Sequence, residues 1–166
     1  MTTDAAIRRC RATDVPDMDA IINEAAEAYR GVIPADCWHE PYMPRQELLA
    51  EIGAGVEFWG WEEGGALLAI MGLQQVRDAT LIRHAYVRRA HQGRGLGAAL
   101  LASLAEQATG PLLVGTWADA EWAIRFYQRR GFRMVSPDEK DHLLSTYWTI
   151  SPRQRETSVV LSYAGA

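Results

Sequence analysis

The feature that most constrains the fold is the stretch 86–101, where a strand-like run leads through three glycines into an amphipathic helix. The glycines are Gly93, Gly95 and Gly97, and the apolar stripe of the helix consists of Leu96, Leu100, Leu104 and Ala108. Glycines let a backbone approach a ligand closely, and the first N–H groups of a helix have no partner within it. Because the helix dipole is positive at this end, the pattern predicts an anion site, most naturally for a pyrophosphate.

Arginines surround the same turn at Arg88, Arg89 and Arg94, and we expect them to add mobile positive charge. The whole chain has 17 basic and 21 acidic residues, a net charge of −4, which argues against a surface that binds nucleic acid. A glycine-rich connector with solvated arginines is the alternative interpretation.

The order of predicted elements indicates an α/β protein of mixed α+β type. Strands are expected over residues 6–11, 56–62, 66–76, 80–87, 112–116, 132–135 and 157–163. Helices are expected over 13–29, 45–52, 95–108 and 120–130, from 137 onwards, and as a short turn after Ser151. The strands over 56–62, 66–76 and 80–87 are joined by short turns and should be antiparallel. The later alternation of helices and strands implies a partly parallel sheet. We therefore expect a central mixed antiparallel and parallel sheet of about seven strands flanked by helices, in one domain over residues 1–166.

Several classes of protein are disfavoured by simple counts. No window approaches the roughly 18 apolar residues of a membrane span, and the first residues lack the apolar core of a secretory signal. We therefore expect a cytoplasmic protein that does not enter membranes. The two cysteines, Cys10 and Cys37, fit no zinc spacing with the four scattered histidines, so no metal is expected.

Two kinds of pyrophosphate ligand compete for the glycine turn. Gly93-x-Gly95-x-x-Ala98 satisfies a relaxed dinucleotide pattern, and Asp119 lies at a tolerable distance downstream. In that pattern, however, the glycines directly follow the strand, whereas five residues separate them from Val87 here. The spacing therefore disfavours NAD.

Two motifs resemble those of one known family. The hexapeptide 92–97 is similar to the Q-x-x-G-x-G acetyl-CoA loop of the GNAT acetyltransferases, and residues 123–132 resemble that family's A-x-x-F-Y-x-x-x-G-F segment after the fifth strand. The resemblance implies the GNAT acyltransferase fold, whose V-shaped sheet holds the pantetheine arm between its fourth and fifth strands. It also implies acetyl-CoA as the co-substrate.

The resemblance assigns roles to individual residues. The pyrophosphate would be held by Gln92, Gly93, Arg94, Gly95, Leu96 and Gly97. The backbone around Tyr86 and Val87 would pair with the pantetheine and orient the thioester carbonyl, and Tyr127 would stand near the CoA sulfur. This chain departs from the family at Arg89, where proline is frequent, and at Ala120, where many members have an asparagine that contacts the ligand.

The implied reaction is transfer of an acetyl group from acetyl-CoA to a primary amine of a small molecule or peptide, by direct attack in a ternary complex. Tyr127 is the predicted general acid, because a phenol with a pKa of about 10 can protonate a leaving thiolate. A packed core aromatic is the alternative role for Tyr127.

The general base has more than one candidate. His84 is the first choice, and strand alternation puts it on the same face as Tyr86, where its alternative role is to be buried or stacked. Asp119 and Glu121 follow the fifth strand and are the other candidates, but Asp119 could equally cap the next helix.

The acceptor amine is constrained only by composition. Acidic and aromatic residues that could surround it are Asp36, Glu40, Asp119, Glu121, Trp38, Trp117, Trp122 and Trp148. They suit a small cationic or aromatic amine, unless the tryptophans belong to the core. The other function considered is a CoA-binding sensor or interaction module without efficient transfer. A homodimer could form through an edge of strand 157–163.

Overall fold

The computed structural model of the chain describes residues 4–165. Residues 1–3 and residue 166 lie outside the described residues. The first residues, for which no secretory signal is expected, therefore lie partly outside them. Contacts divide the chain into two compact units: unit 1 contains Met1–Ala28, His39–Gln74 and Ile82–Gln107, and unit 2 contains Tyr29–Trp38, Gln75–Leu81 and Ala108–Ala166. The segments of the two units alternate along the sequence, and the expectation of one domain over 1–166 stays a prediction.

A seven-stranded sheet confirms the predicted number of strands. Its strands are β1 (Ala5–Arg9), β2 (Glu57–Glu63), β3 (Ala66–Val76), β4 (Ala79–Val87), β5 (Leu112–Trp117), β6 (Phe132–Met134) and β7 (Ser158–Tyr163). They are ordered β1-β2-β3-β4-β5-β7-β6. In unit 1, β2 pairs antiparallel with both β1 and β3. In unit 2, β7 pairs antiparallel with both β5 and β6.

The helices lie where proline, glycine and apolar spacing predict them. They are α1 (Val15–Ala25), α2 (Arg45–Gly53), α3 (Leu96–Gln107), α4 (Glu121–Gln128), α5 (Pro137–Tyr147) and α6 (Pro152–Glu156). The predicted serine caps form, since the Ser136 and Ser151 hydroxyl oxygens accept from the N–H of Glu139 and of Gln154 at 3.2 and 3.1 Å. The helix predicted over 13–29 ends as an α-helix at Ala25 and continues as a 3₁₀ turn over Ala26–Tyr29.

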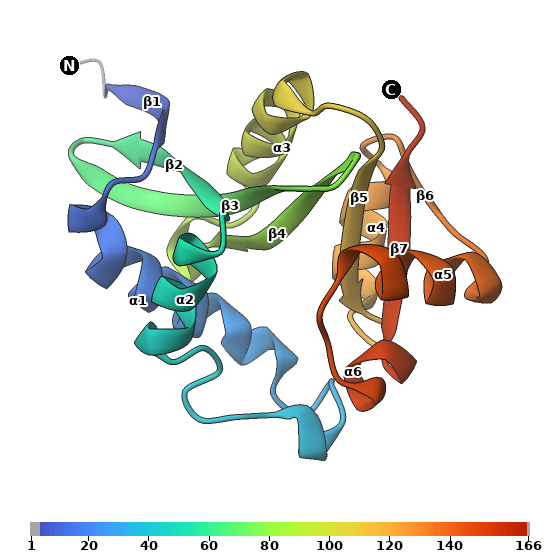
Figure 1. Cartoon of the computed structure of the whole chain (residues 1–166). Helices are drawn as coiled ribbons and strands as arrows, with labels where there is room; N and C mark the ends of the chain where they lie inside the picture. Colours follow the sequence, from blue (N-terminus) through green and yellow to red (C-terminus); the bar gives the residue numbers. More distant parts are fainter. Residues whose placement is uncertain (1–3, 166) are drawn as a thin grey trace. The chain divides into compact units, whose positions relative to one another are not determined.

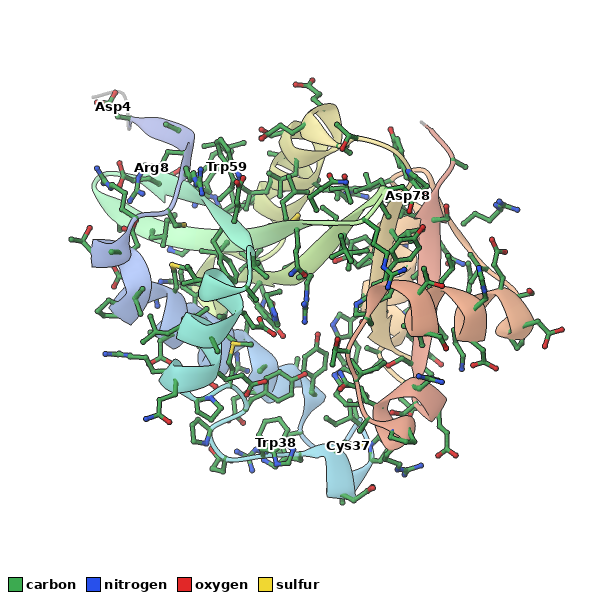
Figure 2. The ribbon with its side chains drawn as sticks, in the orientation of Figure 1. Asp4, Arg8, Cys37, Trp38, Trp59 and Asp78 are labelled. Atoms are coloured by element: carbon green, nitrogen blue, oxygen red, sulfur yellow. The ribbon has the colours of Figure 1, made fainter. Side chains whose placement is uncertain are left out.

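Asp14 occupies the N-cap position of α1, but its side chain makes no cap bond to that helix. Its carboxylate instead accepts two bonds from the Arg8 guanidinium, at 2.8 and 2.9 Å, and one from the N–H of Arg11 at 2.6 Å. The hydrogen bonds from Arg8 are the main cause that lowers the pKa of Asp14 to about 2. Asp14 therefore joins β1, where Figure 2 labels Arg8, to the start of α1.

The core of unit 1 lies on both faces of its strands. Figure 1 shows α3 on one side of β2, β3 and β4 and α1 and α2 on the other. The fully buried side chains on these elements include Met18, Ile21, Ile22, Leu48, Ile70, Met71, Ile82, Leu100 and Leu104. Each such side chain contributes roughly 1.5–3 kcal/mol on burial, so α3 is held firmly beneath the glycine turn that precedes it.

Unit 2 has the same layered plan, with α4 on one side of β5, β7 and β6 and α5 on the other (Figure 1). Leu144 of α5 packs with Val160 of β7 and with Val135. Because β7 has a paired strand on each side, the predicted dimer edge on strand 157–163 is wrong. Among the described residues, no helix is both long and apolar enough to span a bilayer.

Candidate functional site

Within residues 4–165, the glycine turn before α3 holds a row of N–H groups that make no hydrogen bond. Gly93 and Gly95 both have φ of +82°, and a side-chain carbon added to either would meet no heavy atom within 4 Å. Within residues 4–165, no hydrogen bond takes the N–H of residues 93–98. Leu96 points into the core, with 3% of its surface exposed, so it contributes only its backbone. Several N–H donors at a helix N-terminus are a suitable site for a phosphate group.

The turn is held in place from below by its flanking residues. The Gln92 side chain donates from Nε2 to the Val87 carbonyl at 3.2 Å, which closes the loop on itself. Arg88 ties the loop to β3, since its N–H donates to the Leu68 carbonyl at 2.9 Å and its Nε to the Leu67 carbonyl at 3.0 Å. Gln92 thus serves the shape of the turn.

Two of the three arginines around the turn, Arg88 and Arg94, lie beside carboxylates, which corrects the prediction that all three add mobile charge. Arg94 donates to both carboxylate oxygens of Glu63, at 2.8 and 3.1 Å, and lies 2.9 Å from Nδ1 of His91. The same bonds from Arg94 lower the pKa of Glu63. Arg88 lies 3.9 Å from each of two carboxylates on α1. Among described residues, the Arg89 side chain has no ion pair, so backbone N–H groups are the main anion donors here.

His84 lies at an irregular point in β4. Its φ is +55°, which interrupts the regular strand. The imidazole stacks with Phe58, at 6.0 Å and 27°, and with Tyr86, at 6.5 Å and 26°. Nε2 of His84 contacts Oε2 of Glu51, on α2. The structure thus brings His84 and Tyr86 together, as strand alternation predicts, and adds a carboxylate that the sequence did not reveal.

Glu51 lies at the centre of a small charged network in unit 1. Nη2 of Arg83 donates to its Oε1 at 3.1 Å, and Nη1 of Arg83 donates to the Gln74 side chain at 3.0 Å. Burial acts to raise the pKa of Glu51, but the hydrogen bond with His84 and the nearby positive charges outweigh it and lower that pKa. Glu51 is therefore ionised near neutral pH.

Tyr127, in unit 2, is buried among aromatic rings. The rings of Phe126 and Phe132 approach its ring edge-on, at 5.1 Å and 75° and at 5.5 Å and 66°. No hydrogen bond within the described part of the chain uses its hydroxyl. Burial raises the pKa of Tyr127, and the nearby Tyr29 raises it further. The phenol therefore carries its proton throughout the neutral range.

The residues at the start of α4 differ from the prediction that Asp119 caps this helix. Ala120 occupies the cap position with no side-chain bond, and its carbonyl accepts from the N–H of Ala123 at 3.1 Å. Asp119 and Glu121 are both exposed, and Glu121 lies 3.8 Å from Arg125. Since Ala120 is fully buried, an asparagine there would need an internal partner.

The segment 29–38 of unit 2 carries part of the predicted acceptor surface. Figure 2 labels Cys37 and Trp38 on it. The Arg153 guanidinium on α6 donates to Asp36 at 2.9 and 3.2 Å, so that carboxylate is already neutralised. Arg30 lies over the Trp38 ring at 4.6 Å.

Two tryptophans that were predicted to surround the acceptor amine have different surroundings in unit 2. Trp148 packs against core residues of β5 and β7, including Leu113 and Val160, so its alternative role in the core is confirmed. Trp122 is 42% exposed and stacks on Tyr29 at 5.8 Å. Among the described residues, no group of histidine, cysteine and carboxylate side chains could hold a metal ion.

Comparison with known proteins places this geometry in context. The model of the acetyltransferase (GNAT) family matches residues 18–132. The peptidyl-lysine N-acetyltransferase YiaC of Escherichia coli strain K12 is 25% identical over 146 residues, covering 87% of this chain and 94% of that protein.

Solved structures share the fold. The PaiA N-acetyltransferase of Thermoplasma acidophilum, solved with coenzyme A, has a TM-score of 0.72 at 15% identity, covering 97% of this chain and 99% of that one. A GNAT acetyltransferase of Staphylococcus aureus Mu50 has a TM-score of 0.71 at 15% identity, covering 96% and 98%. The predicted fold, a mixed seven-stranded sheet flanked by helices, is thereby confirmed.

Proposed function

Because the chain belongs to the GNAT acetyltransferase family and is an acetyl-CoA-dependent N-acetyltransferase, we propose that it acetylates a primary amine of a small molecule or peptide by direct attack in a ternary complex. The observation that carries the proposal is the row of unoccupied N–H groups over residues 93–98. Family membership favours transfer over the alternatives of a CoA sensor without transfer and of an NAD-dependent enzyme.

The glycine turn is proposed to bind the pyrophosphate of acetyl-CoA. Open space above Gly93 and Gly95 leaves room for a phosphate, and the N-terminus of α3 supplies donors of the right polarity. Gln92 shapes the turn through its bond to Val87, and Arg94 is held at its rim by Glu63. The backbone at Tyr86 and Val87 is proposed to orient the thioester carbonyl, which acetyl-CoA supplies for attack.

Tyr127 is proposed as the general acid that protonates the departing thiolate. One observation supports this role: within residues 4–165, no hydrogen bond already uses its hydroxyl, which is protonated before transfer begins. A buried donor without a partner gains more from an incoming thiolate than an already bonded one does. The aromatic rings of Phe126 and Phe132 fix its orientation.

His84 is proposed as the base that removes a proton from the attacking ammonium. A base near neutral pH is needed because amines of pKa about 10 are mostly protonated there. The contact with Glu51 supports this choice, because a carboxylate stabilises the imidazolium that forms. Asp119 and Glu121 have no comparable partner.

The acceptor is proposed to be a primary amine, with a peptide lysine among the candidates because YiaC is named for that substrate. Exposed Trp122, stacked on Tyr29, is the aromatic surface best placed to contact it. We also propose a single domain over residues 1–166, since the family match at 18–132 includes parts of both units. A cytoplasmic location is part of the same proposal, because the reaction needs a compartment that contains acetyl-CoA.

Ligand binding tests the loop first. Thermal unfolding is measured with acetyl-CoA, free CoA and NAD, and ligand at about 100 times its Kd should stabilise the fold by roughly 2.7 kcal/mol. We expect both CoA forms to stabilise the protein and NAD to have no effect. Stabilisation by NAD alone, or by none of the three, would contradict the proposed ligand.

A glycine pair provides the matched control. Gly95→Ala and Gly55→Ala both place a methyl group at positive φ in open space, at +82° and +105°. Each should cost about 1–2 kcal/mol of stability. Only Gly95→Ala should weaken binding of CoA, by roughly tenfold or more, because displaced N–H groups no longer point at the phosphate. Equal CoA affinities in the two variants would exclude the turn as the site.

The acceptor is tested with a panel of a single-lysine peptide, spermidine and 2-phenylethylamine, with release of the free CoA thiol as the readout. Trp122→Ala should change the order of preference within the panel, with Trp148→Ala as the core control. The chain contains one lysine, Lys140, so acetylation of the enzyme's own side chains contributes little to the signal. Mass spectrometry of the enzyme measures that contribution. An unchanged order in Trp122→Ala would remove this residue from the acceptor surface.

A further inference from the structure

The contact between α2 and β4 contains Glu51, a carboxylate that the proposed reaction uses only to stabilise the imidazolium of His84. Glu51 comes from the last turns of α2, and His84 lies at the irregular point of β4. Oε2 of Glu51 and Nε2 of His84 touch, and both atoms are shielded from solvent. A direct contact of this kind between a carboxylate and an imidazole requires one shared proton.

We propose that Glu51 is a positioning residue that fixes the proton of neutral His84 on Nε2 and leaves Nδ1 as the nitrogen that accepts a proton from the amine. This inference rests on the proposed role of His84 as the base. The geometry supports it because Oε2 of an ionised carboxylate can only accept, so the nitrogen facing it must donate. Within residues 4–165, no hydrogen bond occupies Nδ1 of His84.

Arg83 makes this arrangement electrostatically possible. Its Nη2 donates to Oε1 of Glu51 at 3.1 Å, on the other oxygen from the one that His84 contacts. The charge of the carboxylate is therefore also balanced by a guanidinium that never loses its proton. Gln74 holds Arg83 from its other side at 3.0 Å.

Two aromatic rings restrict the orientation of His84. Phe58 and Tyr86 both stack with it, with ring planes within 27° and 26° of the imidazole. Stacking restricts rotation of the imidazole, and the bond to Glu51 selects which nitrogen points toward α2. During transfer, a proton would move from the ammonium nitrogen to Nδ1, and the lone pair left on nitrogen would attack the thioester carbon. The C–S bond then breaks, and the thiolate takes its proton from Tyr127. The acetylated nitrogen loses its second proton, which restores the Tyr127 phenol, and the His84 imidazolium releases the first proton to solvent.

Nuclear magnetic resonance of the unsubstituted protein gives the first readout. Long-range ¹H–¹⁵N spectra of the imidazoles report which nitrogen carries the proton, and the His84→Gln spectrum identifies the His84 signals. We expect the Nε2–H form of His84 in the wild type and a mixture of both forms in Glu51→Gln. A wild-type ring protonated on Nδ1 would overturn the inference without any kinetic measurement.

Kinetics give the second readout, with the fastest acceptor from the panel above. Glu51→Gln should lower kcat by tenfold or more while KM for acetyl-CoA stays within about twofold, because a glutamine N–H can favour the wrong tautomer. Glu51→Asp should restore part of kcat. The matched control is Glu57→Gln, since Glu57 is an exposed glutamate of β2 paired with Arg9 at 3.5 Å.

The possible failures are distinguishable. If His84→Gln lowers kcat but Glu51→Gln behaves like Glu57→Gln, Glu51 does not position the base, and the proposed function stands. If His84→Gln keeps the full rate, His84 is not the base and the inference fails with it, while acetyl-CoA binding is unaffected.

Discussion

Half-buried His84 and buried Tyr127 are assigned to proton transfer, and burial acts to raise a pKa at both sites but decides the outcome only at Tyr127. His84, in unit 1, contacts a carboxylate that is balanced by Arg83. Tyr127, in unit 2, is surrounded by aromatic rings, and its hydroxyl has no hydrogen bond among the described residues. The first site keeps a charge on Glu51 despite burial, and the second suppresses a charge because of it. Local partners therefore decide how burial changes a pKa.

The largest expected effect is on kcat, when the hydroxyl of Tyr127 is removed. Tyr127→Phe should lower kcat by about 100-fold, within the usual range for a general acid, with little change in stability because no described bond is lost. The control is Tyr147→Phe, which removes a hydroxyl that donates to Asp78 at 2.6 Å. Steady-state kinetics and thermal unfolding check both variants. A similar, small loss of rate in both would return Tyr127 to a packing role.

The next effect concerns stability at the His84 site. Glu51→Gln should destabilise the protein by about 2 kcal/mol at pH 7, since it leaves Arg83 with only one strong partner. The folded-state pKa of Glu51 lies below the ordinary value of 4.5, so its contribution is present above pH 4.5 and is lost as pH falls below it. Urea unfolding at several pH values should therefore show the wild type and the variant converging in acid. A constant difference down to pH 3 would contradict the lowered pKa.

The Tyr127 site should show the opposite pH limit. Its folded-state pKa is raised above the ordinary value of 10.0, so the unfolded chain loses this proton first. Stability should then fall as pH rises above 10, by up to about 1.4 kcal/mol per pH unit, and Tyr127→Phe should remove this part of the fall. Urea unfolding between pH 9 and pH 11 checks the slope. Parallel curves for both proteins would mean that Tyr127 ionises normally.

The smallest expected effect tests whether an exposed carboxylate could be the base. Glu121→Gln should change the rate by less than twofold and the stability by less than about 0.5 kcal/mol, because its pair with Arg125 at 3.8 Å is exposed. The same assay and unfolding experiment apply. A tenfold loss of kcat here would move the base from unit 1 to unit 2.

Local signals predicted much of the fold. Gly31 ends the first helical region, the proline after each serine cap starts α5 and α6, and alternation along β4 places His84 beside Tyr86. These features depend on residues within a few positions of each other, which is why a sequence pattern contains them.

Features that depend on distant partners could not be predicted in this way. Glu51 sits on a helix with weak periodicity, and nothing in its neighbourhood says that it meets a β4 residue 33 positions later. Asp14 resembles a helix cap, but Arg8 offers two bonds and takes its carboxylate. The place of β7 between β5 and β6 is likewise a matter of non-local pairing.

The place of β7 between β5 and β6 also affects how the protein forms during synthesis. The strands β1 to β4 and the helix α3 are complete once residue 107 has emerged from the ribosome, whereas β5 and β6 have no common partner until residues 158–163 follow. Because chains grow at about 5–20 residues per second, β5 and β6 spend several seconds with unpaired edges. Nascent chains stalled before residue 158 should therefore need chaperone protection at β5 and β6, while β1 to β4 can already be paired.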